Sequence, residues 1–155
     1  MDKNEFASRA DQIKKRLYRT AFLYLDSEDM ALDAVDEAIY RGFVSLNKLR
    51  QPDFLETWIT RILINECKKE LRRRKRELPI ESITDEAEDI PDTLPLKEAL
   101  NRLPLELKEV IILRYFTGFT LSESARSLEI PQGTVVTRQR RALCLLKLEL
   151  SEDEL

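Results

Sequence analysis

The stretch Thr120–Arg141, TLSESARSLEIPQGTVVTRQRR, decides the fold of the second half of the chain. Thr120 and Glu123 have the spacing of a capping box, in which each side chain accepts a hydrogen bond from the other residue's backbone amide. A short helix is therefore expected from Thr120, and a second one from Pro131, because proline is tolerated in a first helical turn. Two helices joined by so short a turn are typical of a helix-turn-helix.

The second of these helices has two different faces. At 100° per residue, one side carries Val135, Gln139, Ala142, Leu143, Leu146 and Leu150. The opposite side carries hydroxyl and guanidinium groups, which major-groove recognition requires. An ordinary solvated basic face is the alternative, but the capping box, short turn and basic face together favour DNA reading. The candidate DNA-binding residues are Thr134, Val136, Thr137, Arg138, Arg140 and Arg141.

Apolar spacing elsewhere predicts an all-α chain of two small helical domains. Helices are expected over residues 5–25, from Ser27 to about 46, over 55–71, and then over about 96–103, 104–117, 120–128 and 131–149. The second helix is expected to bury Leu32, Val35, Ile39, Phe43 and Leu46. The predicted boundaries are a first domain at 1–76, an acidic flexible linker at 77–93, a second domain at 94–150 and a frayed tail at 151–155.

Charge is strongly segregated along a chain of 155 residues whose net charge is only −3. Residues 61–76 carry eight lysines and arginines against two glutamates, whereas residues 77–98 carry eight acids against one lysine. The low average charge therefore does not exclude a nucleic-acid partner.

Acidic residues form a stripe on the predicted second helix, within about 100° of arc. A solvated face and a docking face for a basic partner both fit this stripe, and the residues alone do not separate them. The candidate docking residues are Asp29, Asp33, Asp36 and Glu37.

Basic residues form a stripe on the predicted third helix, where phosphate attraction is the natural function. The aromatic ring of Phe54 could stack on unpaired bases, whereas Trp58 lies beside Ile62 and is expected to pack in the core. The candidate nucleic-acid residues are Phe54, Arg61, Asn65, Lys68, Lys69, Arg72 and Arg73.

Several function classes are disfavoured by composition. The chain has no histidine and no phosphate-binding glycine loop, so an enzyme, a cofactor site and a metal site are not expected. Cys67 and Cys144 lie in apolar runs and are expected to be buried and reduced. The N-terminus lacks the apolar segment of a signal peptide, which favours the cytoplasm.

At this point the sequence resembles the extracytoplasmic-function sigma factors of bacterial RNA polymerase. The resemblance rests on the order and spacing of several loose motifs across both domains. These are Asp33–Ile39, Phe54–Asn65, Leu103–Pro104, Val110–Tyr115, Leu121–Ala125 and Gly133–Arg138.

The resemblance implies partners and roles for the charged stripes. The acidic stripe would dock on a basic coiled coil of core RNA polymerase, and the segment 47–72 would recognise the −10 element and capture a flipped base from the melted strand. The helix from Pro131 would read the −35 element. An anti-sigma factor, able to keep the chain at the membrane, is also implied. Catalysis would belong to polymerase.

Three positions depart from the family pattern and bear on these roles. Asp36 stands where glutamine is usual, Glu129 replaces a turn glycine, and Val136 replaces a basic residue. Glu129 is therefore expected to take a positive φ. A stand-alone helix-turn-helix regulator is the main alternative function, and a helical adaptor that binds only protein is a third.

Overall fold

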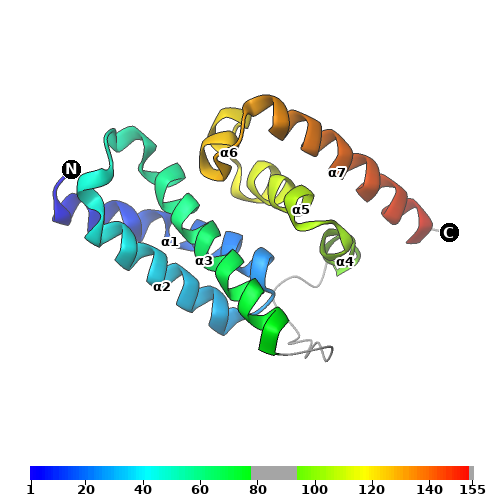
Figure 1. Ribbon diagram of the computed structural model, residues 1–155, viewed down its shortest axis with the longest axis horizontal. Coiled ribbons are helices and arrows are strands. Elements are labelled where there is room, and N and C mark those ends of the chain that lie inside the picture. Colours follow the sequence, from blue (N-terminus) through cyan, green and yellow to red (C-terminus); the bar gives the residue numbers. More distant parts are fainter. Residues whose placement is uncertain (78–93, 154–155) are drawn as a thin grey trace. The chain divides into compact units, whose positions relative to one another are not determined.

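The computed structural model describes residues 1–77 and 94–153, and every regular element in those ranges is a helix. The chain divides into two compact units, one built from α1, α2 and α3 and the other from α4 to α7 (Figure 1). The predicted all-α fold with two helical domains is confirmed.

The N-terminal unit is a three-helix bundle. It consists of α1 (Lys3–Leu25), α2 (Glu28–Val44) and α3 (Leu55–Glu77), and each helix contacts the other two. Two short 3-10 turns, η1 (Leu46–Lys48) and η2 (Pro52–Phe54), join α2 to α3. Ser27 caps α2, because its hydroxyl accepts a hydrogen bond from the Met30 amide at 3.3 Å.

Small residues let α2 approach its neighbours closely. Its inward face consists of Ala31, Ala34, Val35, Ala38 and Gly42, all of them buried. A Cβ at Gly42 would lie only 3.2 Å from the Phe6 ring, so a larger residue there would require that ring to shift by a few tenths of an ångström. The remaining core side chains come mainly from α1 and α3, among them Leu17, Tyr24, Ile59, Leu63 and Cys67.

The predicted burial of Leu32 and Phe43 is wrong. These side chains are 46% and 37% exposed, respectively. Their helical positions lie at the flank of the small-residue face, between it and the aspartates, and the Phe43 ring contacts that of Phe6 on α1, with ring centroids 6.1 Å apart. Apolar spacing along one helix therefore misidentified the face that packs, because α2 packs through alanine and glycine.

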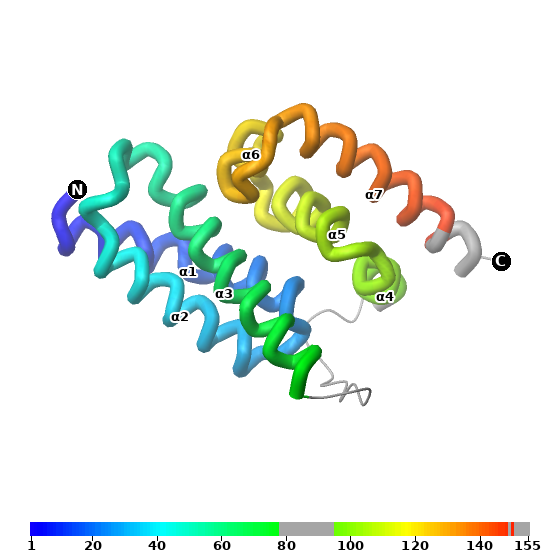
Figure 2. Tube along the Cα trace, in the orientation of Figure 1, coloured from blue at the N-terminus to red at the C-terminus, as the bar shows by residue number. Residues whose placement is uncertain are grey.

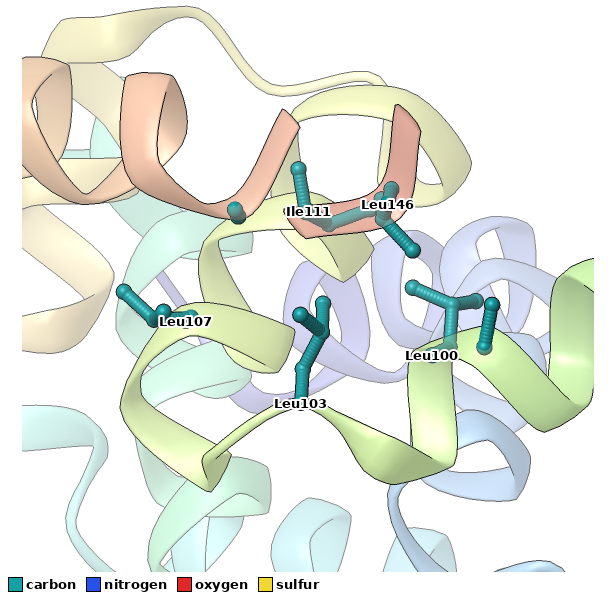
Figure 3. Close-up of a cluster of buried hydrophobic side chains, with 7 residues drawn as sticks. Leu100, Leu103, Leu107, Ile111 and Leu146 are labelled. Carbon is teal, nitrogen blue, oxygen red and sulfur yellow. The ribbon is translucent and has the colours of Figure 1, made fainter. Parts of the chain in front are cut away.

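The C-terminal unit contains α4 (Leu94–Arg102), α5 (Leu105–Ile111), η4 (Ile112–Thr117), α6 (Leu121–Leu128) and α7 (Gln132–Asp153). Figure 3 shows the core, in which side chains of α4 and α5 meet α7. Its buried members are Ala99, Leu100, Leu103, Leu107, Ile111, Ala142 and Leu146.

Several predicted boundaries change. The helix expected over 104–117 is α5 followed by a π-helical turn, η4. The tail expected to fray is helical through Asp153, because α7 continues to that residue. Glu77 ends α3, and the rest of the predicted linker, 78–93, lies outside the described residues.

Two predictions on the C-terminal half of α7 are also wrong. Cys144, expected to be buried, is exposed, and Leu143, expected on the packed face, is 41% exposed. Only Val135, Ala142 and Leu146 of the predicted apolar face are fully buried. The buried face of α7 is thus narrower than the apolar face that its sequence predicts.

Candidate nucleic-acid and partner interfaces

The capping box at the start of α6 is formed as predicted. The Thr120 amide donates to Oε1 of Glu123 at 2.9 Å, and the Glu123 amide donates to Oγ1 of Thr120 at 3.0 Å. Both hydrogen bonds satisfy amides that have no partner within the helix. The start of α6 is therefore fixed by its own sequence.

The turn between α6 and α7, seen in Figure 2, contains one residue in the left-handed region. Glu129 has φ of 56°, which confirms the expectation for this position. The next amide, that of Ile130, donates back to the Ala125 carbonyl at 3.1 Å. The Pro131 carbonyl accepts from the amides of Thr134 and Val135, so Pro131 directly precedes the helix that begins at Gln132.

Arg114 links the entrance of α6 to α7, a role that sequence reasoning missed. Its Nη1 donates to the Phe119 carbonyl at 2.6 Å, and its Nε donates to Oε1 of Gln139 at 2.8 Å. Gln139 was predicted to lie on the core side of α7, and there its side-chain oxygen accepts the hydrogen bond from Arg114. The available signal was a guanidinium directly after the apolar run Val110–Leu113.

The predicted DNA-reading side chains of α7 do not share one environment. Thr137, Arg140 and Arg141 are exposed, whereas Thr134, Val136 and Arg138 are half-buried. Nη2 of Arg138 lies 3.8 Å from Oε2 of Glu106, an ion pair within the same unit. The Thr137 hydroxyl donates to the Gly133 carbonyl at 3.1 Å and keeps its lone pairs available as an acceptor. The outermost guanidinium groups are those of Arg140 and Arg141.

The predicted nucleic-acid stripe of α3 forms one side of that helix. Asn65, Lys69 and Arg72 are exposed, and Arg61 and Lys68 are half-buried. Phe54 closes η2 immediately before α3 and is 36% exposed.

Trp58 packs inside the N-terminal unit, as predicted. Its ring lies 3.4 Å from the position that a Cβ on Gly42 would occupy. The side chain is half-buried, so α3 uses it to contact α2.

Arg73 differs from the other predicted members of the stripe because acidic neighbours hold its guanidinium. Its Nε donates to Oε2 of Glu70 at 3.0 Å, and Nη1 donates to Glu77. The hydrogen bond from Arg73 lowers the pKa of Glu70, and the same interaction raises the pKa of Arg73.

The predicted acidic stripe is on the outer face of α2. Asp29, Asp33 and Asp36 are exposed, and Asp36 lies 3.9 Å from the Lys14 ammonium. Glu37 is half-buried and accepts from Nε of Arg41 at 2.9 Å.

Exposed apolar side chains lie among these carboxylates. Besides Leu32 and Phe43, they include Tyr40 and Val44, which are 64% and 62% exposed. This mixture was missed because the sequence pattern placed two of the apolar residues in the core.

The two thiols lie in different environments, since Cys67 is buried and Cys144 is exposed. Burial raises the pKa of the Cys67 thiol to about 12, so that thiol stays protonated in the folded protein. Across residues 1–77 and 94–153, no group of three or more cysteine, aspartate or glutamate side chains is placed to hold a metal ion. None of the described helices has the length and apolarity needed to cross a bilayer.

Comparison with known proteins identifies both units. The family model described as Sigma-70 region 2 matches residues 10–77, and that described as Sigma-70, region 4 matches residues 99–148. The two units are therefore those of a sigma-70-type transcription initiation factor.

Individual relatives match most of the chain. The RNA polymerase sigma factor SigV of Bacillus subtilis is 35% identical over 147 residues, which cover 92% of this chain and 89% of that protein. The ECF RNA polymerase sigma-E factor of Escherichia coli is 30% identical over 139 residues, covering 77% of this chain and 72% of that protein.

A solved structure shares this fold. The sigma factor RpoE, in a co-crystal with the anti-sigma factor NepR from Bartonella quintana, superposes with a TM-score of 0.82 at 26% identity. The match covers 95% of this chain and 97% of that one. The chain belongs to the extracytoplasmic-function sigma factors, and its function is to direct promoter recognition and transcription initiation by RNA polymerase. A stand-alone helix-turn-helix regulator is not favoured, because the similarity spans both units.

Proposed function

We propose that three exposed faces divide the work of this sigma factor. The outer face of α7 reads the −35 element, the basic face of α3 with Phe54 binds the melted −10 strand, and the outer face of α2 docks on core RNA polymerase. The observation that carries this assignment is the segregation of charge within the N-terminal unit. The exposed face of α2 is acidic, whereas the exposed face of α3 is basic.

Base reading by α7 is supported by the exposure of Arg140 and Arg141. A guanidinium can donate two hydrogen bonds to O6 and N7 of guanine in the major groove. Arg138 contributes less in this proposal, because Glu106 competes for its guanidinium. Thr134 and Val136, both half-buried, are placed at the edge of the reading face and offer a hydroxyl and a methyl contact.

Strand binding by α3 is supported by a row of cations beside one amide. Asn65 is exposed between Arg61 and Lys68, one turn to either side, so its amide can pair with a base edge while the cations contact phosphates. Phe54, which is 36% exposed, offers an aromatic ring for stacking on an unpaired base. The contribution of each phosphate contact is expected to weaken as salt concentration rises.

Polymerase docking by α2 is supported by acidic and apolar side chains on one surface. Asp29, Asp33 and Asp36 suit a basic partner helix, and Tyr40 and Leu32 between them provide the apolar area that stable interfaces contain. Polymerase binding is thus expected to depend on both kinds of residue.

The proposal extends to regulation and location. A relative of the same fold forms a complex with an anti-sigma factor, and we infer that this chain is also controlled by one, which would keep it from core polymerase and could hold it at the membrane. The chain acts in the cytoplasm, where polymerase and promoter DNA are, and performs no chemistry of its own. The acidic segment 77–93 joins the two promoter-binding units, which are assigned to 1–76 and 94–150.

Reversal of charge on α2 tests the docking face. Asp33→Lys is expected to reduce capture of the chain by core polymerase while leaving its circular dichroism spectrum unchanged. Glu98→Lys on α4 is the matched control, because Glu98 is an exposed acidic residue that belongs to none of the three proposed faces. Equal capture of wild type and Asp33→Lys would refute the docking assignment.

Arginine variants, tested on promoters with altered base pairs, examine the proposed DNA-reading face of α7. Arg140→Ala and Arg141→Ala are each expected to weaken holoenzyme binding to the preferred −35 sequence by about 1–3 kcal/mol, if the arginine donates to a base through both of its terminal nitrogens. This weakening should disappear on templates where the base pair read by that arginine is replaced. A uniform weakening on all sequences would show phosphate contacts instead.

A further inference from the structure

Arg74 lies in the middle of the basic run 72–76 but on a different side of α3 from its neighbours. Arg74 follows the buried Cys67 by seven residues, which is close to two helical turns, so the two side chains lie within about 20° of each other around the helix axis. It also follows Leu71 by three residues. Its side chain is 25% exposed, compared with 48% for Arg73. The guanidinium therefore faces the other helices of the N-terminal unit.

The guanidinium joins all three helices of that unit. Nη1 donates to the Leu25 carbonyl at 2.6 Å, at the end of α1. Nε lies 3.0 Å from the Met30 sulfur in the first turn of α2, which Nη2 also contacts. Nε is also 4.0 Å from Oε1 of Glu70, one turn earlier on α3.

The end of α1 has a specific need for this cation. The last four carbonyls of a helix have no partner within it, and together they carry partial negative charge. The last turn of α1 contains no basic residue, and its C-cap residue, Asp26, has the left-handed φ of 54°. Arg74, far along the sequence, supplies the missing donor and positive charge to Leu25.

We propose that Arg74 is a positioning residue for promoter binding, which clamps the end of α3 to the α1–α2 junction and does not itself contact DNA. The clamp holds the exposed cations Lys69, Arg72 and Arg76 in one fixed row. Arg73 is a poor phosphate ligand in this arrangement, because Glu70 and Glu77 already hold it. The inference rests on the proposed binding of nucleic acid by α3.

Lysine cannot replace arginine in such a clamp. The guanidinium donates from separate nitrogens to groups on two helices at once, whereas an ammonium is a single point donor on a flexible stem. At a phosphate contact, by contrast, lysine preserves the charge and most of the attraction. The variant Arg74→Lys therefore distinguishes a clamp from a phosphate contact.

The test compares Arg74→Lys and Arg74→Ala with Arg72→Ala, which replaces the exposed arginine two residues earlier, in the full chain, both free and bound to core polymerase. In the free chain, Arg74→Lys is expected to increase amide hydrogen exchange in residues 70–77 and 26–31 together. In the holoenzyme, it should lower promoter affinity by about tenfold without changing how affinity depends on salt. Arg72→Ala should instead make the negative slope of log affinity against log salt concentration shallower, by about 0.7–0.9, because one phosphate contact is lost.

The outcomes separate the two proposals. The clamp would be overturned if Arg74→Lys had the amide hydrogen exchange and the promoter affinity of the wild type. It would also be overturned if Arg74→Ala reduced the salt dependence of promoter affinity as much as Arg72→Ala does. An unchanged slope in Arg72→Ala would instead refute the nucleic-acid face of α3, while increased exchange in Arg74→Lys would still establish the clamp. Because Arg74→Lys keeps the charge, any loss of fold in Arg74→Ala does not remove the test.

Discussion

Substitution of Arg114 by methionine tests how the recognition helix is held in place. The variant keeps most of the side-chain volume but removes the hydrogen bonds to the Phe119 carbonyl and to Gln139. Each bond has a charged donor, and such bonds contribute about 1.5–3 kcal/mol. Since Arg114 is half-buried and water can replace part of this stabilisation, we expect the C-terminal unit to lose about 2–4 kcal/mol of unfolding free energy in total.

The assay can observe the two units separately because the chain has a single tryptophan, Trp58, in the N-terminal unit. In urea titrations, circular dichroism follows both units and tryptophan fluorescence follows only the first. Arg114→Met should lower the urea concentration at which the C-terminal unit unfolds, which changes the circular dichroism transition but leaves the fluorescence transition of the N-terminal unit unchanged. It should also weaken holoenzyme binding to the −35 element, since α7 loses its link to the entrance of α6.

Gln139→Ala provides the matched control, because it removes only one of the two hydrogen bonds. Its effect should be about half that of Arg114→Met, and the double variant should show a coupling of about 0.5–3 kcal/mol. Unchanged stability and unchanged −35 binding in Arg114→Met would refute the proposed anchoring of α7. Additive effects of the two substitutions would also count against it.

The remaining predictions concern a helix cap, the thiols and an ion pair. Thr120→Ala should destabilise the C-terminal unit by about 1 kcal/mol in the same titration, whereas Thr120→Ser should retain the cap; equal destabilisation by both would contradict the capping role. In the folded protein at pH 8, a thiol reagent should modify Cys144 rapidly and the buried Cys67 only on unfolding, so fast modification of both would disprove the burial of Cys67. Because the pKa of Glu70 is lowered in the folded state, its contribution to stability is complete above about pH 4.5 and is lost as pH falls through the lowered value. Wild type and Glu70→Gln should therefore differ in stability at pH 7 and converge in acid, and a constant difference would exclude this contribution.

Local sequence signals predicted the helix-turn-helix well. The capping box, the positive φ of Glu129 and the helix start near Pro131 each depend on residues close together in sequence, and all three are present in the structure. Local hydrogen-bonding chemistry determines such features almost independently of the rest of the fold.

Features that depend on contacts between helices were predicted less well. Apolar spacing placed Leu32 and Phe43 in the core, but α2 packs through its alanines and Gly42, and these side chains remain exposed. A sequence contains no direct record of which face a neighbouring helix covers. Cys144 was misplaced for the same reason.

The basic run on α3 shows a similar limit. Charge counting grouped the lysines and arginines of residues 61–76 together, but Arg73 and Arg74 already have protein partners. The helical periodicity could have separated Arg74, since it follows Cys67 by two turns. Its carbonyl partner at Leu25 could not be predicted, because that contact requires the packing of α1 against α3.

Reconstituted transcription tests most directly whether this chain is a promoter-specificity subunit. Purified chain is added to core RNA polymerase with a library of duplex promoters, and initiated transcripts are sequenced. We predict transcripts that begin at a defined distance from shared −35 and −10 elements, that require the chain, and that are lost with Asp33→Lys but not with Glu98→Lys. Tight binding of the chain alone to duplex DNA, with no chain-dependent initiation, would contradict this function.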